Sequence, residues 1–188
     1  MRLLVLIYET FAEFEISLLG FVARQERNEV LTAAPDDTLR VRGMGGLTVH
    51  ADLPLSAVDA SEYDALVIPG GEPNVLLERN EVCALIRSFS ERGKLIAAIC
   101  AAPVQLARAG VLEGRRYTTS LNSNPQGLFD LSRKVDEPVV VDGNIITAKG
   151  EAFVDFTFKV LEKLGAYEDA SNAPLWRREF GCLHEGAG

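Results

Sequence analysis

The chain has 188 residues, a length that suits one domain with a full hydrophobic core. Hydrophobic residues make up 47% and charged residues 24% of the composition, as in ordinary globular proteins. The formal net charge of −8 argues against a face that binds nucleic acid. No apolar run approaches the ~20 residues that a membrane-spanning helix needs, so we expect no membrane partner.

The sequence is poor in the side chains that commonly bind transition metals. Its thiols and imidazoles show no metal-ligand spacing: Cys83, Cys100, Cys182, His50 and His184. We therefore predict no metal site and no cofactor. The odd number of cysteines fits a reducing compartment, and Met1-Arg2 leads straight into an apolar run without a cleavage site. We therefore expect a cytoplasmic protein without a signal peptide.

The N-terminal residues predict a buried strand followed by an amphipathic helix. Arg2–Tyr8 is apolar, and Thr10 and Glu13 have capping-box spacing, so the helix should begin near Thr10. An apolar stripe at helical spacing follows: Phe11, Phe14, Leu18, Phe21 and Val22. Glu15 falls inside this stripe, where an ionised and unpaired carboxyl is costly. Glu15 is therefore paired or protonated, or it lies at the edge of the stripe and turns out to water.

The next part of the chain alternates strand and turn signals. A strand is predicted at 29–34, a hairpin at 38–42 and 47–51 with His50 near its end, and a buried strand at 65–68. Pro69-Gly70-Gly71 follows this last strand, and its backbone N–H groups could hold an anion or a developing oxyanion. An apolar stripe from Val82 to Phe89 then predicts a helix, with Cys83 off the stripe.

Cys100 lies between a predicted strand and a predicted helix. Residues 95–99 form a short apolar run, and residues 101–107 have a helical pattern that ends before Gly110. Small residues on both sides permit a strained turn of the nucleophile-elbow kind. A helix that begins just past the sulfur should favour the thiolate and lower the thiol pKa. The alternative is a buried cysteine that acts as a small apolar residue.

The C-terminal part adds a short strand at 117–119, a loop at 121–131, and a hairpin at 139–141 and 145–148. Lys149-Gly150-Glu151 leads into a helix that ends at Gly165. Beyond it, Trp176, Phe180 and Leu183 lie among charged residues and predict an extra amphipathic helix. We expect a core domain of residues 1–165 and an extension of residues 166–188, which packs on the domain or on a partner subunit.

Strands that alternate with helices predict a doubly wound three-layer α/β sandwich with a mostly parallel sheet, of the flavodoxin-like type. The functional crevice of such a sheet lies at the carboxyl ends of its strands. Glu15, Gly70-Gly71 and Cys100 all follow buried strands. We therefore expect them on one rim.

Together these motifs resemble the ThiJ/PfpI superfamily, within the class I glutamine amidotransferase-like fold, from Arg2 to about Gly165. The resemblance implies that Cys100 is the nucleophile, that Glu15 hydrogen-bonds its sulfur, and that the N–H groups of Gly71 and Ala101 form an oxyanion hole. The supporting positions are Gly70, Ser120 and Gly150. It also implies a small-molecule substrate and a homodimer. The C-terminal extension is similar to that of bacterial members labelled intracellular proteases on sequence grounds.

The sequence departs from the family pattern where a histidine would serve as general base. Peptidase-like members place a histidine directly after the nucleophile, where this chain has Ala101. Other members place one after the Thr-Thr strand, where this chain has Ser120. Neither His50 nor His184 matches either motif, so a Cys-His-acid triad is not predicted from this chain alone.

Three functions remain open at this point. The first is a Cys100- and Glu15-dependent hydrolase, or a glyoxalase- or deglycase-like enzyme, acting on a small electrophile. The second is an oxidative-stress sensor or chaperone-like protein that works through oxidation of Cys100. The third is an idle family member that serves as an interaction module. An intracellular cysteine peptidase is the weaker enzymatic alternative, because the histidine is missing.

Overall fold

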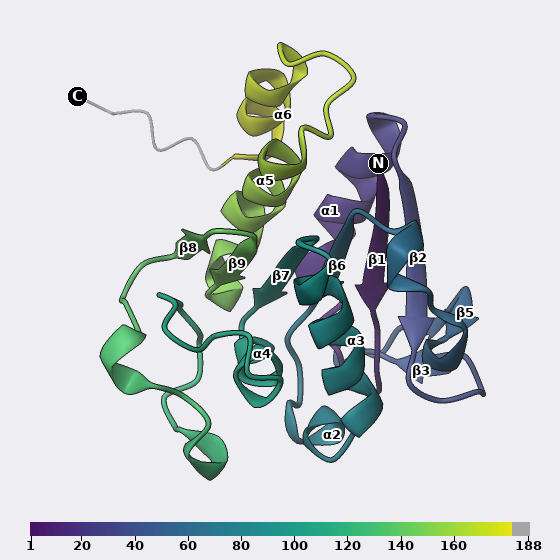
Figure 1. The fold of residues 1–188 in the computed structure, drawn as a ribbon. Helices are drawn as coiled ribbons and strands as arrows, with labels where there is room; N and C mark the ends of the chain where they lie inside the picture. The colour runs from purple at the N-terminus through teal and green to yellow at the C-terminus, as the bar shows by residue number, and fades with distance from the viewer. Residues whose placement is uncertain (182–188) are drawn as a thin grey trace.

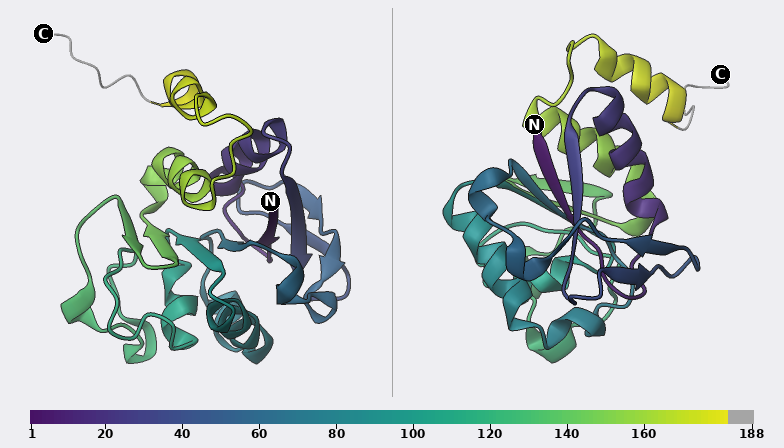
Figure 2. Two further views of the ribbon diagram at one scale, coloured as in Figure 1. Left: turned by 45° about the horizontal axis from the view of Figure 1, so that its top comes forward. Right: turned by 90° about the vertical axis from the view of Figure 1, so that its right-hand side faces the viewer.

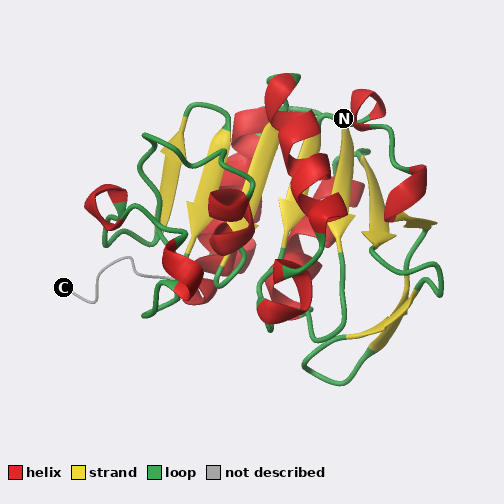
Figure 3. Cartoon of the chain, turned by 60° about the horizontal axis from the view of Figure 1, so that its bottom comes forward, coloured by secondary structure: helices red, strands yellow, loops and turns green. Residues whose placement is uncertain are grey.

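A central sheet between two layers of helices forms the fold (Figures 1 and 3). The computed structural model describes residues 1–181. The strands are β1 (Arg2–Leu6), β2 (Glu29–Ala34), β3 (Arg40–Arg42), β4 (Thr48–His50), β5 (Leu53–Pro54), β6 (Ala65–Ile68), β7 (Leu95–Ile99), β8 (Val139–Asp142) and β9 (Ile145–Ala148). The α-helices are α1 (Phe14–Gln25), α2 (Asn74–Leu77), α3 (Asn80–Glu91), α4 (Pro103–Arg108), α5 (Phe153–Leu164) and α6 (Asn172–Phe180).

The sheet has seven strands in the order β5-β2-β1-β6-β7-β9-β8. All neighbouring pairs are parallel except β8 and β9, which form an antiparallel hairpin. Helices α1 and α5 pack together on one face, and α3 and α4 cover the other (Figure 2). The predicted three-layer α/β sandwich is confirmed. Over residues 1–181, no helix is both long and apolar enough to cross a membrane.

The apolar runs predicted as buried strands lie at the centre of the core. All residues of β6 and β7 are buried, and so are Leu3–Leu6 of β1. A strand that is covered by helices on both faces has no polar side, which explains why these segments lack the alternation of a half-exposed strand. The predicted hairpin is β3 and β4, paired antiparallel outside the main sheet.

Helix α1 differs from its prediction at both the start and the buried face. It begins at Phe14 rather than near Thr10, and Thr10 has a φ of 66°. The Glu13 carboxylate accepts hydrogen bonds from the N–H groups of Gly45 (2.9 Å) and Leu47 (3.2 Å). The predicted capping box is therefore wrong, because the turn of the β3–β4 hairpin takes up the carboxylate that would have capped the helix.

The predicted apolar stripe of α1 is also wrong in its orientation. Its buried residues are Glu15, Leu19, Val22 and Ala23. Phe14 and Phe21 are 52% and 47% exposed, and with Leu18 they line a surface groove. The buried face of the helix is thus rotated away from its largest side chains. The question about Glu15 is settled, because its side chain points into the protein and not to water.

Two further expectations fail in detail. Tyr117 makes one isolated bridge with Lys134 and does not begin a strand of the sheet. Cys83, predicted to lie off the apolar stripe of α3, is buried and accepts a hydrogen bond from Arg108 Nη1 at 3.0 Å. Both residues are fixed by partners that come from distant parts of the chain, which a local pattern does not contain.

The predicted C-terminal helix is present as α6 and packs on the domain. The Nε1–H of Trp176 donates to Glu26 Oε1 at 2.5 Å, and the Trp176 ring packs edge-on against Phe21 with centroids 5.9 Å apart. Leu183, Cys182 and His184 lie outside the described residues. Gly165 ends α5 with a φ of 62°, in the left-handed conformation that glycine adopts without strain.

Candidate active site

Cys100 lies at the carboxyl end of β7 in a strained backbone conformation. Its φ of 62° is unfavourable for a residue with a side chain. The backbone is held on both sides: the Cys100 N–H donates to the Ala148 carbonyl at 2.8 Å, and the Cys100 carbonyl accepts from the Ser120 N–H at 2.9 Å and the Thr119 hydroxyl at 2.7 Å. These bonds offset the strain and fix the half-buried thiol at the rim of the sheet.

The Glu15 carboxyl reaches the same place from α1. Its side chain is 1% exposed, and its Oε2 accepts the Gly70 N–H at 2.6 Å. A Cβ built on Gly70 would lie 2.9 Å from Glu15 Oε2 and 3.0 Å from Cys100 Sγ. A Cβ built on Gly150 would lie 3.1 Å from both Glu15 Oε1 and Cys100 Sγ. The carboxyl and the thiol therefore meet in a space lined by two glycines.

Burial opposes the ionisation of both acidic groups, and the charge of Glu15 adds to this cost at Cys100. Burial raises the pKa of Glu15, and this outweighs the Gly70 N–H and the Cys100 thiol, which favour the charged form. Burial, the charge of Glu15 and the hydrogen bond to it raise the pKa of the Cys100 thiol to about 11. The Ser120 hydroxyl and the Ala101 N–H act on the thiol in the opposite direction.

The sequence predicted that the helix after Cys100 lowers the pKa of the thiol. With Glu15 ionised, this prediction is wrong, because the thiol pKa is raised. Helix α4 has only six residues and begins three residues after the sulfur, whereas the carboxyl is hydrogen-bonded to it. Because each pKa depends on the charge of the other group, the two titrate as a pair. A proton on Glu15 removes the charge that opposes the thiolate, and the carboxylic O–H then becomes a donor to the sulfur.

The backbone N–H groups of Gly71 and Ala101 come directly after Gly70 and Cys100, the residues at the centre of this site. Gly71 has a φ of 130° and packs closely against the backbone of Thr10 and Phe11. Within residues 1–181, neither the Gly71 N–H nor the Ala101 N–H donates to a backbone carbonyl, and the Ala101 N–H points to the Cys100 sulfur. N–H groups at this rim that do not donate to a backbone carbonyl could serve as oxyanion donors.

Ser120 joins the site from the segment after Tyr117. Its hydroxyl oxygen accepts the Gly150 N–H at 2.9 Å and also hydrogen-bonds the Cys100 sulfur. His50, the one histidine within residues 1–181, lies on β4 with its Nδ1 3.1 Å from the Ala51 carbonyl. The structure therefore brings together Glu15, Gly70, Gly71, Cys100, Ala101, Ser120 and Gly150, and holds His50 on the hairpin.

Sequence reasoning missed Tyr8, which belongs to this cluster. The Tyr8 hydroxyl is buried and donates to the Pro69 carbonyl at 3.0 Å, directly before the Gly70-Gly71 turn. The sequence does place a tyrosine at the carboxyl end of a buried strand. A buried tyrosine hydroxyl needs a hydrogen-bond partner, so Tyr8 could have been predicted to bond a group on this rim.

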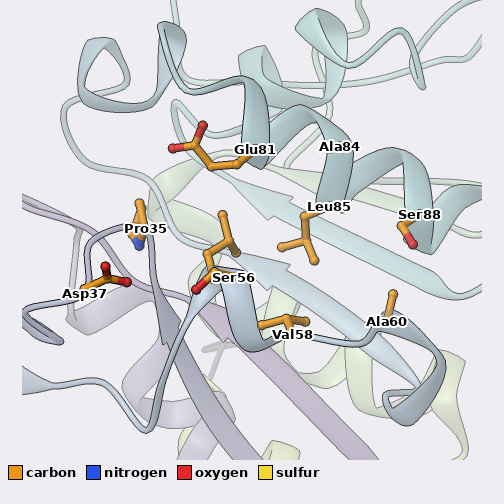
Figure 4. Close-up of a pocket in the computed structure, with 10 residues that line it drawn as sticks. Pro35, Asp37, Ser56, Val58, Ala60, Glu81, Ala84, Leu85 and Ser88 are labelled. Carbon is orange, nitrogen blue, oxygen red and sulfur yellow. The ribbon is translucent and has the colours of Figure 1, made fainter.

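A separate groove of about 470 Å³ lies between α3 and residues 55–60 (Figure 4). Asp37, Ser56, Glu81 and Ser88 supply its polar groups, and none of the predicted site residues lines it. Within residues 1–181, no group of three or more His, Cys, Asp or Glu side chains is arranged to hold a metal ion.

Comparisons with known proteins identify the family of this chain. The family model described as "DJ-1/PfpI family" matches residues 1–163. The protein named Deglycase TK1284 from Thermococcus kodakarensis is 33% identical over 150 residues, which cover 79% of this chain and 90% of that protein. Protein dj-1beta from Drosophila melanogaster is 33% identical over 88% of this chain and 90% of its own length.

A solved structure gives the same result. The DJ-1 superfamily protein Atu0886 from Agrobacterium tumefaciens superimposes with a TM-score of 0.81 at 32% identity, over 95% of this chain and 98% of that one.

The glycine lining of the site predicts the effect of a single methyl group. Gly70→Ala would place its Cβ 2.5 Å from the Cys100 Cβ, so the elbow or the turn has to move. We expect a loss of about 1–3 kcal/mol in the free energy of unfolding, measured by urea denaturation. Gly20→Ala in α1 is the control, because nothing lies within 4 Å of the added Cβ and alanine favours a helix. Equal effects of the two variants would contradict the packing described for the site.

Proposed function

Because this chain belongs to the DJ-1/PfpI family, we propose that it is a deglycase-like enzyme that uses Cys100 and Glu15 on a small carbonyl electrophile. The observation that carries the proposal is the convergence of the thiol and the buried carboxyl over Gly70 and Gly150. The Thermococcus kodakarensis relative is named a deglycase, which supports this class of reaction.

The first step follows from the positions of the groups. Glu15 takes the thiol proton, and the Cys100 sulfur attacks the carbonyl carbon of the substrate. An S–C bond forms, the π electrons of the carbonyl move to its oxygen, and the N–H groups of Gly71 and Ala101 donate to that oxyanion. Glu15 then returns the proton to the oxygen. A carboxyl with a raised pKa can carry this proton near neutral pH without a histidine.

Turnover assays test this proposal directly. The protein is incubated with methylglyoxal, a glycated amide and an isonitrile, and loss of each compound is followed. We expect turnover of the carbonyl compounds, none with Cys100→Ser, and a kcat about 10²- to 10⁴-fold lower with Glu15→Gln. Cys83→Ser is the matched control and should retain turnover. The proposed enzymatic function would be contradicted if Cys100→Ser kept its activity, or if the natural protein turned over none of the compounds.

A second function, oxidation sensing, is supported by the surroundings of the sulfur. Glu15, the Ser120 hydroxyl and the Ala101 N–H all hydrogen-bond it, and the same groups could hold the oxygens of a sulfinate. Intact-mass measurement after mild peroxide separates the two functions, since a sensor oxidises at Cys100 before Cys83 and Cys182. Both functions need a reduced resting thiol, so we also propose a cytoplasmic location.

We further propose that the protein is a homodimer, with the second copy seated on the groove beside α1. This groove of about 570 Å³ is apolar, and its lining residues are Phe14, Ser17, Leu18, Phe21, Phe153, Val154 and Phe180. Two copies that each carry a net charge of −8 repel one another, so their interface needs an uncharged surface. This groove provides one, because none of its lining residues is charged.

A charge placed in the groove tests this interface. Val154→Glu should convert a dimer into a monomer in light scattering, because the new carboxylate would be buried between copies. Leu131→Glu is the control, since Leu131 is 61% exposed and lies outside the groove. A dimer that persists in Val154→Glu, or a natural protein that is monomeric at every concentration, would contradict the interface.

A further inference from the structure

Tyr8 carries a buried hydroxyl that the core does not need for packing. The residue follows β1, is 1% exposed, and donates its hydroxyl to the Pro69 carbonyl at 3.0 Å. A phenylalanine would fill nearly the same volume without a polar atom to satisfy. The hydroxyl therefore calls for an explanation other than the burial of an aromatic ring.

The Pro69 carbonyl and the Gly70 N–H belong to one peptide group. The peptide bonds of the described residues are all trans, so this C=O and this N–H point in opposite directions. Tyr8 holds the carbonyl end, and Glu15 Oε2 accepts at the N–H end at 2.6 Å. A donor on the carbonyl polarises the amide and strengthens its N–H as a donor, because hydrogen bonds in a chain reinforce one another.

No cation supports the charged form of Glu15 among the groups that face it in the described residues. These groups are Cys100 from the β7–α4 elbow and Tyr8 from the segment after β1; Glu72, which acts on Tyr8, is also an acid. Burial and the charges of Glu15 and Cys100 raise the pKa of Tyr8, so the phenol stays protonated and remains a donor. Within residues 1–181, the Gly70 N–H is thus the one backbone donor to Glu15, and Tyr8 acts on it.

We propose that Tyr8 is a positioning residue that sets the orientation and protonation of Glu15 through the Pro69–Gly70 peptide group. The role of Glu15 in turnover rests on the proposed function, but its link to Tyr8 does not. Removal of the hydroxyl weakens the Gly70 donor, so the carboxylate loses stabilisation and Glu15 holds its proton to higher pH.

The test is a carbon-13 NMR titration of protein labelled at the glutamate side-chain carboxyl carbons. The Glu15 resonance is identified by its absence in Glu15→Gln. In Tyr8→Phe we expect its titration midpoint to rise by about half a pH unit, a threefold change in proton affinity. The rise should persist when Cys100→Ser is added to both proteins, because the path through Gly70 does not involve the thiol.

Tyr63→Phe is the matched control, since Tyr63 is equally buried but lies against Phe89, away from Glu15. A midpoint in Tyr8→Phe within 0.2 units of the natural protein would overturn the proposal, and so would an equal rise in Tyr63→Phe. The titration needs no substrate. If the midpoint shifts but the protein shows no turnover, the role of Tyr8 is supported and the proposed enzymatic function is contradicted.

Discussion

A carboxyl group buried against a thiol is the interaction on which the rest of this site depends. Glu15 occupies a position of α1 that packing alone would give to an apolar residue, between the backbone turn of Gly70 and the sulfur of Cys100. Water is largely excluded, so neither group ionises as easily as it would at the surface. The pair can therefore hold one proton in common and move it over a short distance.

The fold provides the conditions for this pair at some cost to its own stability. Cys100 is held in a left-handed conformation by hydrogen bonds from two segments. A methyl group at Gly70 would collide with the Cys100 Cβ, and one at Gly150 would press tightly against the thiol and the carboxyl. A parallel sheet brings the ends of β1, β6 and β7 together, so residues far apart in the chain meet on one rim. The strained backbone of Cys100 and the desolvated Glu15 and Cys100 side chains therefore lie together at the candidate active site.

Much of this arrangement could be predicted from the sequence, and the failures share one physical cause. Apolar runs predicted the central strands because burial on both faces leaves a continuous local pattern. The elbow at Cys100 was predictable from its small neighbours. The start of α1 was not, because Glu13 caps a hairpin turn some thirty residues away instead of its own helix.

The orientation of α1 and the protonation of the site depend on contacts of the same long-range kind. Phe14 and Phe21 follow helical spacing, but α5 and α6 leave them at the surface while Glu15 turns inward. The thiol pKa was expected to fall because a helix follows it in the sequence. It rises because the thiol is buried and because a carboxyl from another helix lies against it, and no spacing within the segment 94–103 contains that information.

The unfolding free energy as a function of pH tests the burial of Glu15 most directly. A carboxyl whose pKa is raised by folding costs stability above that pKa and nothing below its unfolded value. Glu15→Gln should therefore be more stable than the natural protein by about 1 kcal/mol at pH 7, and the difference should vanish near pH 4. Glu13→Gln, at a carboxyl whose pKa is lowered by backbone N–H groups despite its burial, should instead lose stability at pH 7. If the stability gained by Glu15→Gln over the natural protein is no larger at pH 7 than at pH 4, the burial of Glu15 described here is wrong.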